Sequence, residues 1–503
     1  MHTKKSYGEI LKSSSIMGGA AVFTMLFGMI RTKFAAIYLG SMGVGVIASY
    51  TAIQGLIGII AGLGIQSSAV REIVVATGKS DARSLGRVVL TVRRVCWLTG
   101  LVGMLTMIMF SPLLSRLTFN SETYTLDIAA LGIVIFLNNL SGWRLALLQG
   151  MRRISEMARV NVIGAVLSMI IAIAFYHVLG LRGVVPSLVF IAAMQLIIAW
   201  RFTYLIPVPL VTFAWKDSLL EAKSMVKMGF VLMWNGLLVS AVGYFTIYLI
   251  TNNASLHAVG LYSAAFMLSG ISVNFILGAM AADYYPRLTS VAHDDVLLNR
   301  LTNEQTEIGV LLALPGLLGT LVLAPMIINV FYSSEFLGAI NLLQWFVVGC
   351  LARVISWPLG FIILALGKGR WFLLTETSGN FAHLALLAIG LRWFDVEGIA
   401  IAFFVVNFIY IAAVYLVCRN LTGFGWSNSS RQILLFALVI TILIFIGCRV
   451  LPIWFATLVG LLMTIGVGIF CLRELTKLLG SDHTLVKFIS SLPGAKLLIN
   501  PNK

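Results

Sequence analysis

Four cationic side chains lie inside long apolar runs of this sequence, namely Arg31, Lys33, Arg144 and Arg353. A charge in the hydrocarbon region of a membrane costs several kcal/mol unless it faces a cavity, a partner or water. Glu376 is the one clear carboxylate in a comparable position. An interior with more cations than acids suits an anion, because guanidinium and ammonium groups bind phosphate and pyrophosphate oxygens. We therefore take the four cations as candidate binding residues for an anionic substrate.

Arg31 is the strongest of these candidates because it is far from the end of its apolar run. It lies nine residues before Gly40, about 13 Å along a helix, which is too deep for easy snorkelling. Lys33 is shallower, and its long side chain can reach the interface. The two residues point about 200° apart on a helix, so one cavity takes at most one of them squarely. The alternative for Arg31 is a structural ion pair with an acid on a neighbouring helix.

Each of the other buried charges has a functional and a structural interpretation. Arg353 lies in the middle of an apolar run, where we expect it to face the interior. Arg144 lies eight residues before Arg152, about 12 Å along a helix, so snorkelling competes with substrate binding there. Glu376 is a candidate coupling residue that relays a proton, or else it pairs with an arginine. Arg353 is not an obvious partner, since it lies deeper than Glu376 by roughly 10 Å.

Polar residues inside or beside the apolar runs offer further candidates. Asp283 and Arg287 form a candidate cytoplasmic gate at the end of the eighth run, and the simpler explanation is a polar helix end that Pro286 stops. Intramembrane amides are candidates for binding sugar hydroxyls, and they serve equally well as hydrogen-bond partners between helices. These amides are Gln54, Asn138, Asn139, Asn235, Asn274, Gln344, Asn380 and Asn407.

Motifs for other chemistries are absent from the sequence. There is no P-loop, no G-x-S-x-G and no C-x-x-C, and the histidines lack metal-ligand spacing. The five cysteines fall in or beside apolar runs, as is typical of small core residues. We expect neither enzyme activity, nor a metal, nor a cofactor, with H+ or Na+ as candidate coupling ions.

The composition is that of an integral membrane protein. Of 503 residues 59% are hydrophobic and 11% are charged, with a mean hydropathy of +0.99, whereas soluble domains carry about 25% charged residues. Apolar runs of about 20 residues, the length that spans a bilayer, occur fourteen times. Their ranges are 12–39, 44–66, 88–110, 125–149, 159–179, 184–204, 226–250, 256–282, 308–331, 338–366, 371–391, 396–418, 432–450 and 452–472.

The placement of lysine and arginine predicts the topology. With the N-terminus in the cytoplasm, 27 of the 35 Lys and Arg residues fall in inside segments and four in outside segments, which is the positive-inside bias. Both termini are then cytoplasmic, and the bias explains the net charge of +16 without nucleic acid as a partner. A mixed-charge run from Asp294 to Glu307 on the inside has the pattern of an amphipathic surface helix.

A weak internal repeat predicts two lobes. Val44-Gly45-Val46 in the second run resembles Val259-Gly260-Leu261 in the eighth, so the second copy is offset from the first by six helices. We expect an all-α polytopic fold of about 14 transmembrane helices, in which two parallel six-helix lobes are related by a pseudo-two-fold axis along the membrane normal. The expected domains are an N-lobe (1–205), a C-lobe (206–420), two additional helices (421–475) and a cytoplasmic amphipathic tail (476–503).

Three stretches resemble the Wzx-type polysaccharide translocases of the MOP superfamily, which also includes the MATE exporters and the lipid II flippase MurJ. They are the opening segment with Arg31, Ala35, Leu39-Gly40 and Gly45, then ADYYPRLT from Ala282 to Thr289, and QWFVVGCLARVISWPLGFIILALGKGRWFLLTE from Gln344 to Glu376. The last is similar to the enterobacterial common antigen flippases, and the resemblance covers roughly residues 8 to 420. Many Wzx proteins have two helices fewer than the number expected here.

The resemblance implies a flippase that moves an undecaprenyl-pyrophosphate-linked oligosaccharide, such as an O-antigen or enterobacterial common antigen unit, across the bilayer by ion-coupled alternating access. Arg31 matches a cavity arginine of MurJ-like flippases, and Arg353 and Glu376 fall within the Wzx-like stretch. The implied setting is the bacterial inner membrane, with the polymerase and chain-length regulator of the same pathway as partners. Two repeats in one chain are compatible with a functional monomer.

Two other function classes stay open at this point. A MATE-like exporter of cationic drugs needs buried acids, and this interior has the opposite sign. A polysaccharide polymerase or ligase needs a substantial periplasmic loop, and the outside loops expected here are short.

Overall fold

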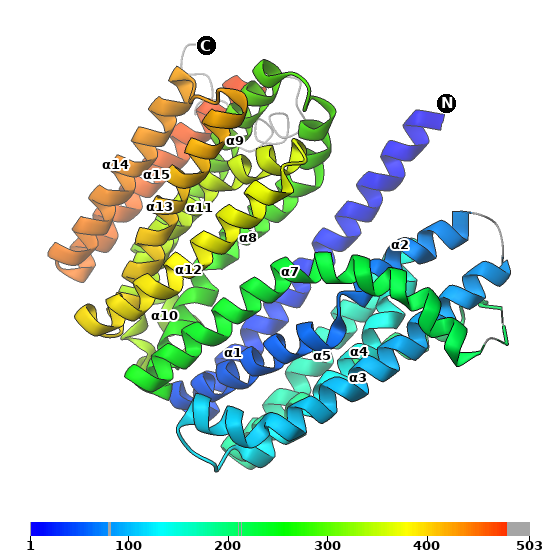
Figure 1. Ribbon diagram of the computed structural model, residues 1–503. Helices are drawn as coiled ribbons and strands as arrows, with labels where there is room; N and C mark the ends of the chain where they lie inside the picture. The colour runs from blue at the N-terminus through cyan, green and yellow to red at the C-terminus, as the bar shows by residue number, and fades with distance from the viewer. Residues whose placement is uncertain (1, 79–81, 210, 213, 480–503) are drawn as a thin grey trace. The chain divides into compact units, whose positions relative to one another are not determined.

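The computed structural model describes residues 2–78, 82–209, 211–212 and 214–479, and regular structure in this part of the chain is helical throughout (Figure 1). It comprises fifteen α-helices and two short 3₁₀ helices. Ten helical stretches among the described residues are long and apolar enough to span a membrane. The expected all-α polytopic membrane fold is therefore confirmed.

The helices follow one another with short connections. In chain order they are α1 (His2–Gly62), α2 (Ile65–Gly78), α3 (Ala82–Phe119), α4 (Thr125–Gly150), α5 (Ile154–Leu179), η1 (Gly180–Gly183), α6 (Val184–Tyr204), α7 (Trp215–Asn253), α8 (Leu256–Ser290), α9 (Asp295–Val322), α10 (Ala324–Phe331), η2 (Ser334–Phe336), α11 (Ala339–Ala365), α12 (Gly369–Phe394), α13 (Glu397–Thr422), α14 (Asn428–Val450) and α15 (Ile453–Leu479).

Each of the fourteen expected apolar ranges lies almost entirely on helical residues, and turns at 63–64 and 323 interrupt two of them. Two apolar stretches, Ile16–Gly62 and Ile154–Tyr204, contain 47 and 51 residues, and about 70 Å of helix is enough for two crossings of a hydrocarbon core about 30 Å thick. The first is interrupted at Gly40, whose φ of 66° favours glycine. The second is interrupted at η1. The number of crossings and the two-lobe arrangement stay predictions.

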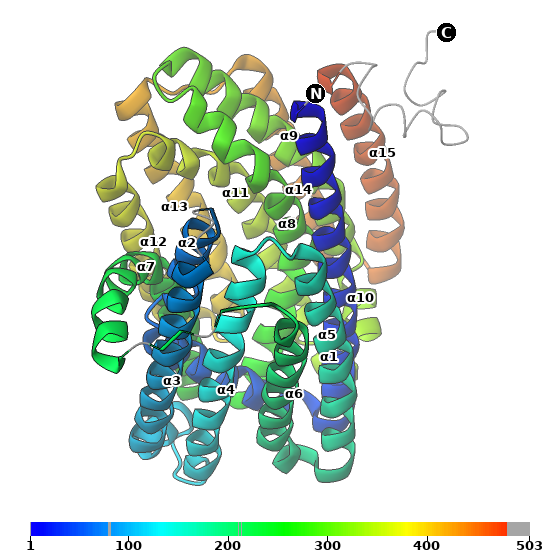
Figure 2. The ribbon, with the colours of Figure 1, turned by 90° about the vertical axis from the view of Figure 1, so that its right-hand side faces the viewer.

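The first compact unit comprises the residues up to Gly260 together with Phe331–Glu335. Within it α4 packs against α3 and α6, and α5 packs against α6 and α1. Figure 2 shows α3, α4, α6, α5 and α1 side by side with their axes nearly parallel. α7 packs against α1, α2 and α3 in the same unit. The boundary expected between an N-lobe (1–205) and a C-lobe (206–420) stays a prediction.

The second unit comprises Leu261–Val330 and the residues from Phe336 onward. α11 packs against α9 and α13, and α12 packs against α13. α14 and α15, which cover the additional helices expected at 421–475, pack against α9. The tail expected at 476–503 lies for the most part outside the described residues, which end with α15 at Leu479.

Two expectations, one about a helix end and one about an exposed helix face, are wrong. Pro286 does not stop its helix, because α8 continues to Ser290; a proline removes one donor and here leaves the final turn in place. Glu307 is not on an exposed helix face, since only 5% of the residue is accessible. Its carboxylate accepts hydrogen bonds from the hydroxyls of Ser430 (2.6 Å) and Ser427 (3.2 Å) at the N-terminus of α14. The positive end of that helix dipole favours an acid there, so Glu307 holds α14 on α9.

Candidate functional site

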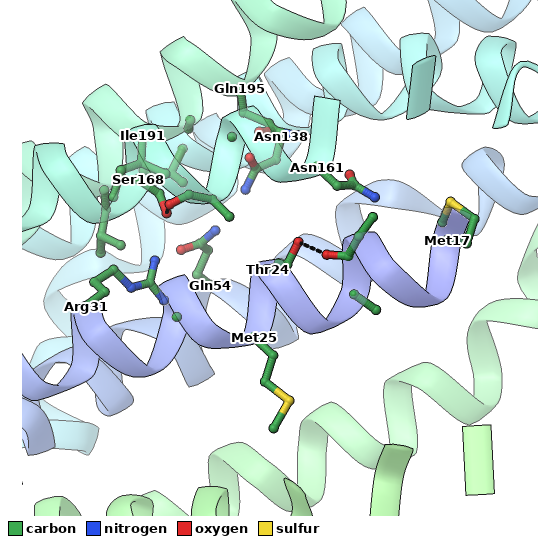
Figure 3. A pocket seen from close by; sticks show the side chains of 18 residues that line it. Met17, Thr24, Met25, Arg31, Gln54, Asn138, Asn161, Ser168, Ile191 and Gln195 are labelled. Carbon is green, nitrogen blue, oxygen red and sulfur yellow. Dashed lines mark hydrogen bonds between the residues drawn. The ribbon is translucent and has the colours of Figure 1, made fainter. Parts of the chain in front are cut away.

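A cavity of about 650 Å³ lies inside the first unit among α1, α4, α5 and α6 (Figure 3). This volume is within the usual range of ligand pockets, about 300–1,000 Å³. In Figure 3 the side chains of Arg31, Gln54 and Asn138 point into this common space. The polar residues that line it are Thr24, Arg31, Gln54, Asn138, Asn161, Ser168 and Gln195.

Glycines make the space around Arg31. Gly28 lies three residues before Arg31 on the same face of α1, and a Cβ placed on it meets no other atom within 4 Å. On α5, a Cβ on Gly164 lies only 2.2 Å from Oε1 of Gln195. Glycine at these two positions therefore keeps the cavity open beside Arg31 and gives the Gln195 side chain of α6 its room.

Arg31 is half-buried in the cavity wall. Within the described part of the chain its guanidinium forms neither a hydrogen bond nor an ion pair, and no acidic side chain lines the cavity. A guanidinium carries five N–H donors in a planar fork that matches phosphate oxygens. The structural ion pair considered as the alternative for Arg31 is not formed among these residues, so its charge is available to an anion.

Four amide side chains share the cavity with Arg31. They are Gln54, Asn138, Asn161 and Gln195. Each amide offers two donors and an acceptor, which suits the hydroxyl groups of a sugar. Sequence reasoning singled out Gln54 and Asn138 and missed Asn161 and Gln195. The available signal was the helical spacing of Asn161 with two other small or polar residues on α5, Gly164 and Ser168.

A second cavity of about 370 Å³ shares Gln54 and Asn138 with the first. The part of α1 that follows Gly40 lines it with Gly55, Gly58 and Gly62, which lie on one helix face. The first cavity thus lies mainly against the part of α1 before Gly40 and the second against the part after it, and Gln54 and Asn138 line both.

Lys33 does not line the cavity that contains Arg31. Its Nζ donates to the backbone carbonyl of Tyr332, in the short segment of the first unit that precedes η2. In the same segment the Glu335 carboxylate accepts from the backbone N–H of Ser41 at 3.0 Å. The structure therefore gives Lys33 a contact that holds this segment, on another side of α1 from the cavity.

Arg144 also lies outside the Arg31 cavity, in a separate pocket of about 360 Å³ between α3, α4 and α6. At 100° per residue, the α4 residues that line this pocket lie on nearly the opposite helix face from those that line the Arg31 cavity, and the same holds for α6. Its Nη1 donates to Oγ1 of Thr203 at 2.9 Å. The structure does not bring Arg144 and Arg31 to one ligand.

Arg353 and Glu376 belong to the second unit. Arg353 is half-buried on α11, and its side chain forms no hydrogen bond or ion pair with the described residues. Glu376 on α12 accepts a hydrogen bond of 2.5 Å from the Tyr410 hydroxyl of α13. Its partner is therefore a tyrosine rather than an arginine.

Asp283 and Arg287 form an ion pair of 3.1 Å one turn apart on α8, and both side chains are exposed. Such a pair contributes little to stability. Between them Tyr284 is buried, and its hydroxyl lies within hydrogen-bond distance of Thr302 Oγ1 (3.1 Å) and of the Pro358 carbonyl (3.2 Å). The residue of this motif that packs the second unit together is Tyr284, which sequence reasoning did not select.

Comparison with known families gives one match over most of the chain. The model of the family Polysacc_synt_3, described as "Polysaccharide biosynthesis protein", matches residues 39–341. Among curated proteins none matches.

Solved transporters share the fold. An inward-facing multidrug resistance MATE family transporter of the MOP superfamily superimposes with a TM-score of 0.67 at 15% identity, over 80% of this chain and 94% of that one. The lipid II flippase MurJ in an inward closed conformation gives 0.66 at 15% identity, over 92% and 99%. A MOP superfamily transporter from Pyrococcus furiosus gives 0.59 at 15% identity, over 82% and 95%. At this identity the likeness concerns the fold alone.

Proposed function

The chain belongs to the polysaccharide biosynthesis protein family and has the fold of MOP superfamily transporters, and from this premise we propose that it flips a lipid-linked oligosaccharide. The substrate is an undecaprenyl-pyrophosphate-linked glycan of the O-antigen or enterobacterial common antigen kind, moved from the cytoplasmic to the periplasmic leaflet. The observation that carries the proposal is the cavity in which, among the described residues, Arg31 lies with four amides and without an acid.

The cavity chemistry divides the substrate into two parts. The guanidinium of Arg31 binds the pyrophosphate, because charge-assisted hydrogen bonds to phosphate are stronger than neutral ones. The amides of Gln54, Asn138, Asn161 and Gln195 bind glycan hydroxyls through their donors and acceptors. The polyprenyl tail stays in the lipid, because removing it from hydrocarbon gains nothing.

The charge of the cavity decides between this function and drug export. MATE-like export of a cationic drug needs an acid at the binding site, and none of the described residues that line the cavity is acidic. Polymerisation or ligation is disfavoured as well, because the family and the fold are those of transporters.

The remaining features of the mechanism follow from the same proposal. Transport proceeds by alternating access, with H+ or Na+ as coupling ion and Glu376 as its candidate site. Arg353 of the second unit is a further candidate for binding an anion. The protein works as a monomer in the bacterial inner membrane with both termini in the cytoplasm. The polymerase and the chain-length regulator of the same pathway are its functional neighbours.

Substitution of Arg31 tests the proposal. We expect Arg31→Ala to weaken binding of a polyprenyl-pyrophosphate-linked oligosaccharide about ten- to hundredfold, the value of a charged hydrogen-bonded contact, and to abolish its transport in proteoliposomes. Arg392→Ala, at an exposed arginine of α12, is the matched control and leaves both unchanged. Full transport by a folded Arg31→Ala protein would overturn the proposal.

A further inference from the structure

A pocket on the first unit that the proposed transport cycle does not use combines two arginines with three tryptophans. It has a volume of about 360 Å³ and lies between α3, α4 and α6. Arg93 and Trp97 come from α3, Trp143 and Arg144 from α4, and Trp200 from α6. Aliphatic side chains complete the wall. The pocket therefore presents cationic groups at the edge of an aromatic and aliphatic surface.

Neither arginine has an acidic partner among the residues that the structure describes. No acidic residue of the described chain lines the pocket, and neither Arg93 nor Arg144 forms an ion pair there. Arg144 is held in place, since its guanidinium stacks 4.4 Å from the Trp143 ring centroid and its Nη1 donates to Thr203 Oγ1 at 2.9 Å. Its Nε is buried without a hydrogen-bond partner. Two guanidiniums that share one pocket repel each other, so an anion between them is favoured.

The neighbouring Arg94 on α3, by contrast, has both a hydrogen-bond partner and an aromatic partner. Nη1 of Arg94 donates to Ser218 Oγ at 2.8 Å, and its guanidinium lies 4.7 Å from the Trp215 ring centroid. The guanidinium of Arg94 therefore contacts α7. Arg93, one residue earlier, points about 100° away around α3 and lines the pocket.

The aromatic part of the pocket faces outward. Trp97 and Trp200 are each 47% exposed, whereas Trp143 is 7% exposed. The exposed rings are supported by neighbours, Trp97 by Phe136 at 6.0 Å and Trp200 by Tyr204 at 5.5 Å between ring centroids. Tryptophan on the outer surface of a membrane protein is typical of the level where head groups meet acyl chains.

We propose that this pocket binds one acidic phospholipid, with its phosphate between Arg93 and Arg144 and its glycerol and upper acyl chains on the tryptophans. Guanidinium groups bind phosphate oxygens in bidentate geometry, and basic pockets between transmembrane helices are known to hold anionic head groups. A phospholipid fits better than the flipped substrate, because the pocket faces away from the Arg31 cavity on both α4 and α6.

Lipid binding by the full-length protein tests the proposal. The probes are phosphatidylglycerol and phosphatidylcholine, added to delipidated protein in detergent and counted by native mass spectrometry. We expect Arg93→Gln and Arg144→Gln each to weaken phosphatidylglycerol binding about tenfold, from the loss of one charged contact, and the double variant to bind both lipids alike. Arg201→Gln removes an exposed cation beside Trp200 that does not line the pocket, and it leaves the preference for phosphatidylglycerol intact.

Further measurements keep the result interpretable. Melting temperatures in detergent alone show that each variant is folded, and Arg93 is exposed, so Arg93→Gln carries the test if Arg144→Gln does not fold. Arg31→Gln leaves phosphatidylglycerol binding unchanged, which separates this site from the transport cavity. Equal phosphatidylglycerol binding by wild type and a folded Arg93→Gln protein overturns the proposal. So does displacement of the bound phosphatidylglycerol, one for one, by a polyprenyl pyrophosphate.

Discussion

Gly45 and Gly260 contact each other's helices in a reciprocal way. A Cβ on Gly45 lies 2.0 Å from the backbone oxygen of Leu256, and a Cβ on Gly260 lies 2.0 Å from that of Ser41. In each case the oxygen belongs to the residue four positions before the opposite glycine. Such reciprocity is the geometry of a local two-fold axis, and these are the two glycines that the internal repeat pairs. The two-lobe arrangement that the repeat predicts stays a prediction.

This reciprocal contact predicts matched effects of two substitutions. Gly45→Ala and Gly260→Ala each place a methyl group against a backbone carbonyl, so we expect each to destabilise the protein by about 3 kcal/mol, the upper end of overpacking costs. Gly466→Ala on α15 is the control, because a Cβ there meets no atom within 4 Å. Thermal unfolding in detergent measures the effect. Unequal losses at the two glycines would contradict the reciprocity.

Gly28 offers a way to block the transport cavity without touching its polar groups. Because a Cβ on Gly28 has open space around it, Gly28→Leu places its side chain in the cavity beside Arg31 while the helices stay packed. We expect the melting temperature to be kept and most of the transport rate to be lost. Gly466→Leu is the matched control. Transport at the normal rate by Gly28→Leu would show that the substrate takes another route.

Arg31 and Lys33 should separate binding from stability. Lys33→Met removes the contact with the Tyr332 carbonyl, so we expect a lower melting temperature and unchanged substrate affinity. Arg31→Met removes the free cation of the cavity, so we expect the reverse pattern. Melting temperature and substrate affinity, both measured on purified Lys33→Met and Arg31→Met proteins, check this. A loss of substrate affinity in folded Lys33→Met protein would show that Lys33 takes part in substrate binding.

Glu376 is the candidate coupling residue of the second unit. If its carboxylate carries the coupling ion, Glu376→Gln removes the acceleration of transport by an H+ or Na+ gradient and leaves substrate binding in place. Transport into vesicles with and without each gradient measures this. The control is Asn407→Leu, because the Asn407 amide donates to the Phe403 carbonyl of its own helix. A gradient response that survives in Glu376→Gln assigns the coupling to another group.

Glu307 should matter for the docking of α14. Glu307→Ala leaves the hydroxyls of Ser427 and Ser430 without that acceptor, and we expect a loss of about 1–3 kcal/mol. Glu304→Ala, one turn earlier and in an exposed ion pair with Arg300, is expected to cost less than about 1 kcal/mol. Protease cleavage between Gly423 and Ser427, together with thermal unfolding, reports on both. Equal behaviour of the two variants would place Glu307 outside the docking contact.

Hydropathy sufficed to place the helices, because a segment in hydrocarbon must satisfy its backbone internally and be apolar over its length. The break before Pro452 and the expected range 184–204 agree with α14, α15 and α6 to within a few residues. The family resemblance also proved correct. The end of α8 was less predictable, because a proline in the final turns removes one backbone donor without ending the helix.

The site was predictable only in part. Arg31 stood out because a deep cation is costly wherever it lies. Its companions Asn161 and Gln195 did not, because an amide in a helix gives no sign of which way the helix is rotated. Rotation also decided the place of Arg144, which depth alone had grouped with Arg31. Glu307 was misplaced because its neighbours Arg300 and Glu304 have the spacing of an exposed helix face, and its partners come from α14.

The glycine face of Gly55, Gly58 and Gly62 bears on how fast a substrate can move. Backbone without side chains has no rotamers to rearrange and no long polar groups to grip a passing sugar. Cβ atoms on Gly55 and Gly58 would meet nothing within 4 Å, so there is open space along this face of α1. A transporter that bound its substrate tightly at every point of the cavity would release that substrate slowly. In the proposed cycle the polar contacts with the substrate come from Arg31 and from amides of both cavities, Gln66 and Asn139 of the second cavity included, and the glycine face adds none.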